Sequence, residues 1–384
     1  MRLTLVISSL QGGGAERVMT TMANHWAAAG WTITLLTLDD GTAPLFYELD
    51  NRVRRLPLAV AKDSSNAIAA FRNTIKRVRA LRHAIRDSRP DVVLSFMDTT
   101  NVITILATRA FRVPVVVSER SDPESNNPGK LWSLLRQMTY PLADALVVQS
   151  KGAFDYFSPS VQSRAHIIPN PVLFPVLRNQ EASIEIRKPF AAAMGRMVRA
   201  KGFDLLLRAF AQIKDKHSKW SLAILGDGPL RGEIEMFRDE LGLCDRVVMP
   251  GRVSNPYEVL SQADLFVMSS RYEGFPNALC EAMASGLAVI STDCPSGPRE
   301  IIRDEIDGLL VLNQDVTMLA NAMDRLMSNE TERAMLGARA CEVTRRFSLD
   351  EVARIWERVL VSSIIRRLPG KDKAKLLVNE TSSH

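Results

Sequence analysis

Short apolar segments alternate with amphipathic helical segments along almost the whole chain, and this alternation most restricts the possible folds. In a parallel sheet covered by helices on both faces, each strand is a short, continuously apolar run. In the first half such runs lie at 3–9, 32–38, 91–95, 113–118 and 145–148. In the second half they lie at 190–194, 221–225, 247–249, 264–268 and 288–291. The sequence therefore predicts an α/β fold of two Rossmann-like domains facing a cleft.

An interruption of this alternation predicts the domain boundary. The segment Ile168-Pro169-Asn170-Pro171 and the polar stretch 178–188 carry several prolines and no clear periodicity. Near the end, Ser348-Leu349-Asp350-Glu351 has a capping-box pattern and begins a helix whose apolar stripe must pack on another surface. The expected organisation is an amino-terminal domain at 1–170, a linker at 171–188, a carboxyl-terminal domain at 189–347, a helix returning to the first domain at 348–367, and a basic tail at 368–384.

Composition narrows the class of protein. The chain has 384 residues, of which 46% are hydrophobic, and no apolar run approaches the roughly 20 residues of a membrane-spanning helix. We interpret the opening run 3–9 as a first strand and not as a signal peptide, which favours a cytoplasmic protein. The net charge of +6 favours an anionic substrate or anionic lipid, while no nucleic-acid-binding motif is present.

The cysteines argue against metal binding and disulfides. Cys244, Cys280, Cys294 and Cys341 form no C-x-x-C pair, and each stands near apolar residues in the sequence. Zinc sites and disulfide frameworks normally show paired spacings. We therefore expect free thiols in a reducing compartment.

Two clusters in the second half carry the chemistry. Gly195-Arg196 and Lys201-Gly202 follow the apolar run 190–194, and Glu273 and Glu281 follow the run 264–268. Both clusters should lie at the carboxyl ends of strands, where open α/β sheets bind ligands. An arginine fork and a lysine ammonium suit a diphosphate, and carboxylates accept from sugar and ribose hydroxyls. The pattern indicates a sugar-nucleotide site.

Other glycine-rich segments are less specific. Gly12-Gly13-Gly14 resembles many strand-to-helix turns, and it does not satisfy the dinucleotide pattern G-x-G-x-x-G because position 17 is Arg. The segment Gly226-Asp227-Gly228-Pro229 is compatible with a tight turn or with a ligand contact.

Taken together, these motifs resemble the retaining glycosyltransferases of family 4, which have the GT-B fold. The resemblance rests on Gly195-Arg196-x(4)-Lys201-Gly202, Gly226-Asp227-Gly228-Pro229-Leu230, Glu273-Gly274-Phe275-Pro276-Asn277-Ala278-Leu279-x-Glu281-Ala282 and Gly12-Gly13-Gly14-Ala15-Glu16-Arg17. It covers nearly all of residues 1–365. More narrowly, residues 95–101 and 118–121 resemble members that extend polyprenyl-diphosphate-linked glycans, such as the N-acetylgalactosamine-transferring enzymes of bacterial N-glycan assembly.

The resemblance implies roles for individual residues. Arg196 and Lys201 would hold the donor diphosphate and stabilise the leaving nucleotide, with Glu273 on the transferred sugar, as the catalytic group. Glu281 would hold the ribose, and backbone N–H groups at 275–278 would face the phosphates. The implied donor-binding set is Gly13, Gly14, Gly195, Gly226, Arg252, Gly274, Phe275, Pro276, Asn277, Ala278 and Glu281. No metal or other cofactor is expected, and a uridine diphosphate sugar is the expected donor.

The first half departs from the family at one position. Many members carry a histidine after the run 113–118 that contacts the donor sugar, whereas Arg120 stands there in this chain. An arginine could reach the same hydroxyl or a lipid phosphate. Asp98 and Glu119 are candidates for acceptor contacts or for support of such contacts.

The segment 68–86 predicts a helix with an apolar stripe beside a basic one, and it carries no acidic residue. The apolar stripe is Ile68, Phe71, Ile75, Val78, Leu81 and Ile85, and the basic stripe is Arg72, Lys76, Arg79, Arg82 or His83, and Arg86. One interpretation is a solvated face on an ordinary core helix. The other is docking on anionic lipid, with Arg72, Lys76 and Arg79 holding the diphosphate of the acceptor.

These inferences predict a glycosyltransferase at the cytoplasmic face of the inner membrane. It would move a sugar from a uridine diphosphate donor to a polyprenyl-diphosphate-linked saccharide with retention. Alternatives are a lipopolysaccharide-core or capsule transferase with another lipid acceptor, and a catalytically silent nucleotide-sugar-binding protein. A Rossmann dehydrogenase would require a nicotinamide-binding loop that the first half lacks.

Overall fold

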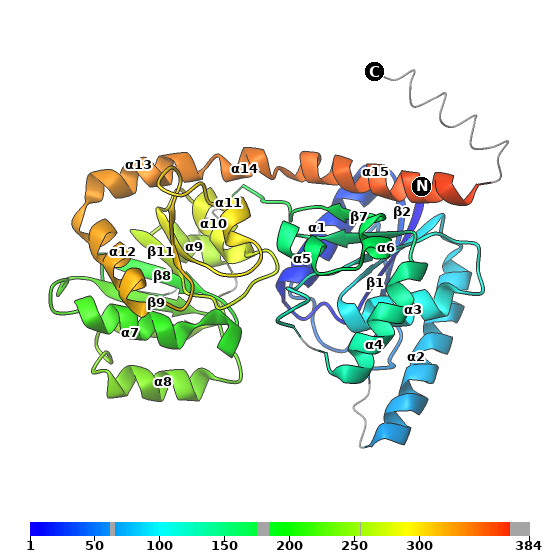
Figure 1. The fold of residues 1–384 in the computed structure, drawn as a ribbon, viewed down its shortest axis with the longest axis horizontal. Coiled ribbons are helices and arrows are strands. Elements are labelled where there is room, and N and C mark those ends of the chain that lie inside the picture. Colours follow the sequence, from blue (N-terminus) through cyan, green and yellow to red (C-terminus); the bar gives the residue numbers. More distant parts are fainter. Residues whose placement is uncertain (62–65, 127, 175–183, 254, 369–384) are drawn as a thin grey trace. The chain divides into compact units, whose positions relative to one another are not determined.

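A computed structural model describes residues 1–61, 66–126, 128–174, 184–253 and 255–368. Its contacts divide the chain into two compact units: unit 1 comprises residues 1–169 and the chain from Asp350 onward, and unit 2 comprises Asn170–Leu349. Each unit is a parallel sheet covered by helices (Figure 1). This architecture confirms the expected α/β class with two Rossmann-like domains.

Within the described residues, unit 1 contains a seven-stranded sheet in the order β3-β2-β1-β4-β5-β6-β7, with every pairing parallel. Its strands are β1 (Arg2–Ile7), β2 (Thr32–Thr37), β3 (Arg54–Pro57), β4 (Val92–Phe96), β5 (Val115–Ser118), β6 (Ala145–Val148) and β7 (Ala165–Ile167). Its helices are α1 (Gly14–Ala28), α2 (Ala67–Ser88), α3 (Asp98–Thr108), α4 (Lys130–Thr139), η1 (Tyr140–Leu142), α5 (Lys151–Asp155), α6 (Pro159–Gln162) and α15 (Leu349–Arg367).

The described part of unit 2 contains a six-stranded parallel sheet in the order β10-β9-β8-β11-β12-β13. Its strands are β8 (Phe190–Met194), β9 (Ser221–Leu225), β10 (Val247–Gly251), β11 (Leu265–Met268), β12 (Val289–Asp293) and β13 (Leu309–Leu312). Its helices are η2 (Arg199–Lys201), α7 (Phe203–Ile213), α8 (Arg231–Glu240), α9 (Pro256–Leu260), α10 (Asn277–Ala284), α11 (Pro298–Ile301), α12 (Val316–Ser328), α13 (Glu330–Ala340) and α14 (Val343–Arg346).

The strand orders locate one switch point in each sheet. In unit 2 the chain runs outward from β8 through β9 to β10, then returns to β11 on the other side of β8 and continues to β13. In unit 1 the corresponding neighbours are β1 and β4. In open α/β sheets, ligands generally bind at such a point, beside the carboxyl ends of the strands.

The final helix, α15, packs on unit 1. Trp356 is fully buried, and its ring centroid lies 5.9 Å from that of Phe96 on β4. At the other end of the helix, Arg367 Nε donates to Asp144 Oδ1 at 2.6 Å. The apolar stripe seen in the sequence is therefore part of the unit 1 core.

Helix α2 covers the core with only its second half. Leu81 and Ile85 are buried, as a core stripe requires, but Ile68 is 74% exposed and Phe71 is 67% exposed. The interpretation of 68–86 as an ordinary core helix is therefore wrong for its first half. That half extends past the helices beside it, as the light-blue helix in Figure 1 shows.

Three strands were absent from the sequence-based prediction: β3, β7 and β13. All three lie at sheet edges, and they are only three or four residues long. β3 contains Arg54 and Arg55, and an edge strand tolerates such charges because one side faces solvent. Hydrophobic runs therefore do not reveal β3 and β7, whereas β13 is a short apolar run, Leu309–Leu312, that the prediction missed.

The four cysteines differ in exposure. Cys280 and Cys294 are buried, whereas Cys244 and Cys341 are exposed. Cys244 Sγ donates to Asp239 Oδ1 at 3.0 Å. All four thiols are free, as expected.

Candidate active site

Lys201 and Glu273 meet at the switch point of unit 2. Lys201 ends η2, just after β8, and Glu273 lies in the loop after β11, the strand beside β8. Lys201 Nζ lies 2.6 Å from Glu273 Oε1 and 2.8 Å from Oε2. Ser270 Oγ donates to the same Oε1 at 2.6 Å. The two clusters that the sequence singled out are thus joined by a bidentate ion pair.

This ion pair is largely shielded from solvent. The Glu273 side chain is 8% exposed and that of Lys201 is 24% exposed. A charge–charge interaction is stronger in such surroundings than at an open surface, because less water screens it. A buried carboxylate beside a mobile ammonium can hold that ammonium in place and can also accept hydrogen bonds from sugar hydroxyls.

Glycines allow the loops of this site to pack backbone against backbone. Gly202 has φ +62°, and a Cβ atom there would clash with the carbonyl oxygen of Ser269 after β11. Gly226 has φ +128°, and a Cβ there would clash with the carbonyl oxygen of Gly195 after β8. Only glycine fits both requirements without strain. Close packing therefore explains the glycine at position 226 without any ligand contact, although a backbone contact to a ligand stays a prediction.

Helix α10 begins inside the Gly-Phe-Pro-Asn segment. Pro276 is the N-cap and Asn277 is the first helical residue, so the first-turn N–H groups at 277 and 278 lie beside the switch-point loop. Such a helix start attracts phosphate through its N–H groups and its dipole. Glu281 lies one turn further on and is 6% exposed. The structure thus places Glu281 inside the helix.

Two neighbouring loops fix the start of α10. Asn170 Nδ2 donates to Asn277 Oδ1 at 2.6 Å. A Cβ atom at Gly297, after β12, would lie 2.7 Å from Pro276 Cδ, so that loop also packs closely here. The side chain of Phe275 is buried against Phe347, with ring centroids 5.6 Å apart. Phe275 can therefore contribute only backbone groups to a ligand site, and Gly274 precedes it in the same loop.

Arg196 and Arg252 are exposed. Arg196 follows β8 in the loop that also contains Gly195, and Arg252 follows β10. Neither side chain is drawn into the Lys201–Glu273 pair. Their predicted roles toward a diphosphate depend on reach from the loops and stay predictions.

Cys294 lies close to this pair, but its thiol is unreactive. Burial raises the pKa of its thiol to about 12, and the nearby Glu273 carboxylate adds to the shift. The thiol therefore stays protonated at neutral pH and is no nucleophile.

In unit 1 the glycine segment forms the turn between β1 and α1. Gly13 is the N-cap of α1 and Gly14 is its first residue. The ring of Phe46 covers this turn: a Cβ atom at Gly12 would lie 2.9 Å from Phe46 Cγ. The turn lies at the β1–β4 switch point, where a ligand contact from Gly13 or Gly14 is geometrically reasonable.

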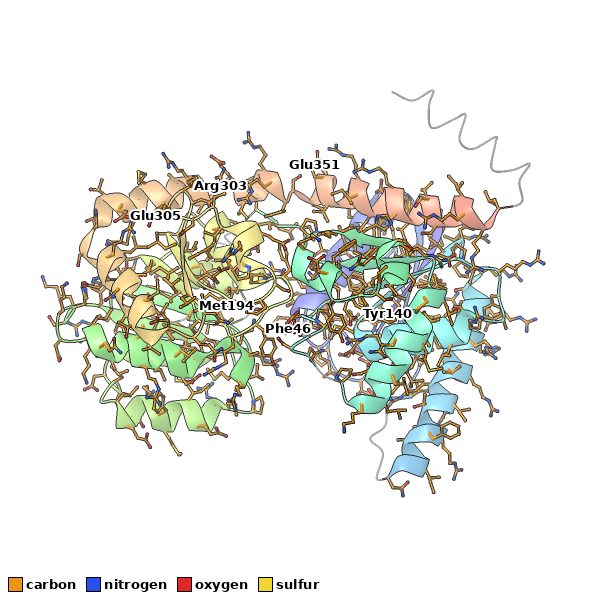
Figure 2. All side chains as sticks on the ribbon, viewed as in Figure 1. Phe46, Tyr140, Met194, Arg303, Glu305 and Glu351 are labelled. Atoms are coloured by element: carbon orange, nitrogen blue, oxygen red, sulfur yellow. The ribbon has the colours of Figure 1, made fainter. Side chains whose placement is uncertain are left out.

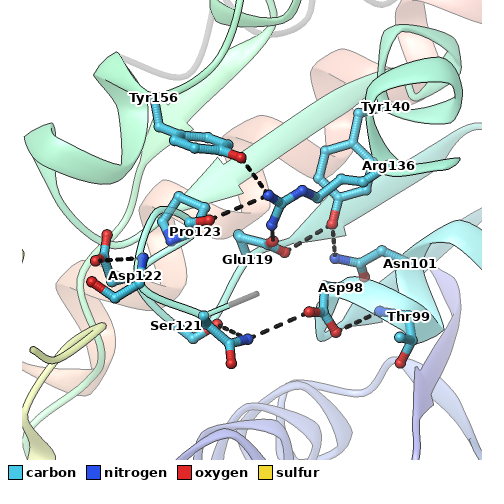
Figure 3. Close-up of polar contacts among 12 residues, drawn as sticks. Asp98, Thr99, Asn101, Glu119, Ser121, Asp122, Pro123, Arg136, Tyr140 and Tyr156 are labelled. Atoms are coloured by element: carbon cyan, nitrogen blue, oxygen red, sulfur yellow. Dashed lines mark hydrogen bonds and ion pairs between the residues drawn. The ribbon is translucent and has the colours of Figure 1, made fainter. Parts of the chain in front are cut away.

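Glu119, immediately after β5, is the centre of a buried network (Figure 3). Arg136 Nη1 donates to Glu119 Oε1 at 3.0 Å, and Tyr140 Oη donates to Oε2 at 2.8 Å. Arg136 Nη2 also donates to the Pro123 carbonyl at 3.2 Å, and it lies 2.6 Å from Tyr156 Oη. Both Glu119 oxygens are thus engaged within unit 1, which assigns Glu119 to support of the loop after β5.

The environment of Glu119 shifts its proton affinity. Burial raises the pKa of Glu119 from 4.5 to about 7, while Arg136 and Tyr140 oppose the shift and the Asp98 charge adds to it. The network therefore carries a carboxyl group that titrates near neutral pH. Sequence reasoning missed Arg136, Tyr140 and Tyr156, because they lie 17 to 37 positions from Glu119 and share no motif with it.

Asp98 and Arg120 lie beside this network. Asp98 is the first residue of α3, and Asn126 Nδ2 donates to its Oδ2 at 3.4 Å. The Arg120 guanidinium lies 4.4 Å from the ring centroid of Phe96, and Nη1 donates to Ser118 Oγ at 3.4 Å. Burial lowers the pKa of Arg120 to about 9, so the group is still a cation at neutral pH. A half-buried carboxylate and a buried cation thus both follow strands at the carboxyl edge of the unit 1 sheet.

The basic face of α2 is only partly available to a ligand. Arg82 donates to the carbonyls of Ala107 and Leu106 at 3.0 and 3.1 Å, so it caps the end of α3. His83 pairs with Asp87 at 3.5 Å. Arg72, Lys76 and Arg79, the three residues predicted to meet a diphosphate, are exposed on the first two-thirds of the helix.

Two further features are absent from the described residues. Over those residues, no helix is both long and apolar enough to cross a membrane. The same part of the chain contains no cluster of three or more His, Cys, Asp or Glu side chains arranged to hold a metal ion.

Family comparison defines the class of protein. The family described as Glycosyl transferase 4-like domain matches residues 13–171, and that described as Glycosyl transferases group 1 matches residues 178–343. Together the two matches span most of the chain. The chain belongs to the glycosyltransferases with these two domains, and it is a hexosyltransferase.

Individual relatives narrow the comparison. Over 361 residues the chain is 29% identical to the GalNAc-alpha-(1->4)-GalNAc-alpha-(1->3)-diNAcBac-PP-undecaprenol alpha-1,4-N-acetyl-D-galactosaminyltransferase of Campylobacter jejuni, covering 94% of this chain and 98% of that protein. This similarity confirms the expected resemblance to N-acetylgalactosamine-transferring enzymes.

Solved structures confirm the GT-B fold. Sucrose-phosphate synthase from Thermosynechococcus elongatus matches with a TM-score of 0.80 and 21% identity, covering 94% of this chain and 99% of that one. Anabaena HepE in complex with UDP and glucose matches with a TM-score of 0.74 and 17% identity, covering 94% and 100% of the two chains.

Proposed function

We propose that this glycosyltransferase moves a sugar from a UDP-sugar to a polyprenyl-diphosphate-linked saccharide, with retention of configuration and without a metal ion. The proposed location is the cytoplasmic face of the inner membrane. The Campylobacter relative, which is named for an undecaprenol-linked acceptor, supports the acceptor class. The Anabaena structure, which contains UDP and glucose, supports the nucleotide.

The Lys201–Glu273 pair beside the start of α10 is the observation that carries the proposal. It brings together a cation, a buried carboxylate and the start of a helix at the switch point of one sheet. These groups match the parts of a nucleotide sugar. The cation and the helix start can bind the diphosphate, and the carboxylate can accept hydrogen bonds from the sugar hydroxyls. In this proposal Glu281, which is buried one turn into α10, accepts a hydrogen bond from the ribose.

In the proposed reaction, Arg196, Lys201 and the start of α10 bind the diphosphate. Negative charge grows on the leaving phosphate oxygen as the bond to the anomeric carbon breaks, so donors already aimed there stabilise the transition state. Lys201 is held by Glu273 before the donor binds and can share its three N–H donors between Glu273 and the phosphate. These cations supply the positive charge for which other transferases use a metal.

Retention follows in this proposal from attack on the same face that the diphosphate leaves. The acceptor hydroxyl oxygen forms the new bond to the anomeric carbon, and the bond to the phosphate oxygen breaks. The acceptor proton goes to an oxygen of the leaving diphosphate. Glu273 positions the sugar and Lys201, and it forms no bond to carbon.

Unit 1 takes the acceptor in this proposal. Arg120 and the exposed cations Arg72, Lys76 and Arg79 provide positive charge for the acceptor diphosphate and for anionic lipid. Asp98, at the start of α3, is placed to accept from a saccharide hydroxyl. Glu119 and Arg136 hold the loop that carries Arg120.

The experiment that tests the proposal is a measurement of nucleoside diphosphate release from a panel of sugar nucleotides. Each donor is assayed with and without a short polyprenyl-diphosphate-linked glycan, and the lipid product is analysed by mass spectrometry. We expect release from one uridine donor that depends on the acceptor. The product masses then distinguish a single addition from a polymerisation. UDP binding without release from any donor would contradict the proposal.

A further inference from the structure

The most exposed large apolar side chains of unit 1 gather on two helices. Among its described residues the four highest values are Ile68 at 74%, Phe71 at 67%, Leu131 at 66% and Met138 at 64%. The first two lie on α2 and the last two on α4. Ile75, Leu134 and Leu142 add to the same set at 36%, 53% and 37%. We call these seven residues the apolar surface. A soluble protein normally keeps so many large apolar groups covered.

The topology brings α2 and α4 to one face of the unit 1 sheet. The connections from β3 to β4 through α2, β4 to β5 through α3, and β5 to β6 through α4 all advance in the same direction across the sheet. Parallel crossovers are right-handed, so these three helices share one face. α2 and α4 both pack against α3 and flank it.

The two helices also begin at the same edge of the sheet. α2 ends just before β4 starts, and α4 with η1 ends just before β6 starts, so both helices begin near the carboxyl ends of the strands. Ile68, Phe71, Leu131 and Leu134 occupy their first two turns. This edge is also where Asp98 and Arg120 lie. In Figure 2, side chains project outward from the lower end of α2.

Positive charge surrounds the apolar surface. Arg72, Lys76 and Arg79 lie between and beside its α2 members, and Lys130 begins α4. Neither α4 nor α2 up to position 86 contains an acidic residue, and Glu124 is an exposed carboxylate in the loop before α4. Apolar side chains mixed with cations suit the interface of an anionic bilayer, where the chains enter the acyl region and the charges meet phosphates. A symmetric contact between this surface and the same surface of a second copy would bring these cations together, and they would repel one another.

We infer that the first half of α2 and the outer face of α4 insert together into an anionic phospholipid bilayer, with α4 as a second anchor. The docking is hydrophobic as well as electrostatic. This inference rests on the proposed function, because it explains how the carboxyl edge of the unit 1 sheet reaches an acceptor that is anchored in lipid. It goes further in assigning membrane insertion to Leu131, Leu134 and Met138, outside the basic helix.

The test is co-sedimentation with vesicles of phosphatidylcholine and phosphatidylglycerol at low and at high salt. The variant Leu131→Gln/Met138→Gln removes apolar groups without changing charge, and both side chains are exposed, so the fold should persist. The matched control is Met236→Gln/Met335→Gln, which changes residues that are 64% and 47% exposed in unit 2. We expect the first variant to lose on the order of tenfold in partition coefficient, and to lose the binding that remains at high salt. The control should bind as wild type does.

A second readout separates this inference from the proposed function. With a short-chain acceptor that stays in solution, the α4 variant should turn over at the wild-type rate and keep its affinity for UDP. Wild-type vesicle binding by the α4 variant would overturn the inference and leave the proposed function standing. Conversion of a wild-type dimer to a monomer by the same variant, with unchanged vesicle binding, would also overturn it, because the surface would then join two chains. Failure of the wild-type protein with the soluble acceptor would count against the proposed function alone.

Discussion

Lys201 Nζ touches both carboxylate oxygens of Glu273, at 2.6 and 2.8 Å, although the two residues are 72 positions apart. The pair joins the loops after β8 and β11. These neighbouring strands form the switch point of the unit 2 sheet, where the order in which the chain adds strands reverses. A contact there serves two purposes in our account. It stabilises the loops, and it holds an ammonium group at the point where a donor diphosphate would enter.

The structural purpose of this pair is testable by Lys201→Met, which removes the charge and keeps most of the stem. Glu273 is 8% exposed, so the variant leaves a buried carboxylate without its cation. We expect a loss of about 1–3 kcal/mol in the free energy of unfolding, measured with urea. Lys216→Met is the control: Lys216 pairs with Asp324 at 2.7 Å but is 64% exposed, and such pairs contribute about 0–1 kcal/mol. Equal losses in both variants would contradict this assignment.

Gly226→Ala tests the close packing of the loops in unit 2. The new Cβ would meet the backbone carbonyl of Gly195 and would also require φ +128°, where alanine is strained. We expect a loss of about 2 kcal/mol or more in unfolding free energy, together with weaker UDP binding. Gly232→Ala in α8 is the control, because a Cβ there meets nothing within 4 Å. If Gly226→Ala were as stable as that control, the loops could not be packed as described.

The Glu119–Arg136 pair predicts a pH-dependent stability. The pKa of Glu119 is raised from 4.5 to about 7, so the folded protein keeps a proton that the unfolded chain releases. The stabilising contribution of this carboxyl is therefore complete below pH 4.5 and is lost as the pH rises through about 7. Arg136 reduces this loss, because its positive charge stabilises the carboxylate that forms.

Arg136→Met should consequently cost more stability at pH 8 than at pH 5. At pH 8 wild type is stabilised by ionising Glu119 beside Arg136, whereas without the cation the pKa of Glu119 rises further and the carboxyl stays protonated, as it is in both proteins at pH 5. One pH unit above a pKa of about 7, this makes the loss at pH 8 larger by about 1.4 kcal/mol. Urea unfolding at the two pH values measures the difference. Glu119→Gln/Arg136→Met is the control, since it should remove the pH dependence. The same loss at both pH values in the single variant would rule out a titrating Glu119.

The basic face of α2 predicts a separation of acceptor from donor binding. Changing Lys76 and Arg79 to Glu should raise the KM for a polyprenyl-diphosphate-linked acceptor by about tenfold or more, because each cation near a lipid surface contributes about 1 kcal/mol. UDP affinity should stay the same. Lys219→Glu/Arg325→Glu in unit 2 controls for net charge, because it also replaces two cations by Glu and both residues are exposed there. An unchanged acceptor KM in the α2 variant would show that these cations do not bind the acceptor.

The sequence was sufficient to predict the central strands of both sheets and the motifs around Lys201 and Glu273. Central strands such as β8 and β11 are continuously apolar, and the motifs around Lys201 and Glu273 follow these two strands. It was insufficient where tertiary packing decides the outcome. Helix α2 has a regular apolar stripe, but the chain supplies a core only to its second half, and periodicity cannot show where the neighbouring helices end.

Buried polar contacts were equally hidden. Glu119 was a candidate acceptor contact from its place after a strand, and only the fold shows that Arg136 and Tyr140 occupy both of its oxygens. The partners come from α4 and η1, elements that start more than ten residues later. No local pattern connects them.

The most direct test of the central claim is UDP release by wild type and by Lys201→Met, measured side by side with the lipid-linked acceptor. Removing a cation aimed at a leaving diphosphate should lower kcat by about 100-fold or more. Lys216→Met should keep the wild-type rate. If wild type releases UDP only in the presence of acceptor and Lys201→Met does not, the switch point of unit 2 is the donor site. If Lys201→Met turns over as wild type does, the donor is held elsewhere and the account is wrong.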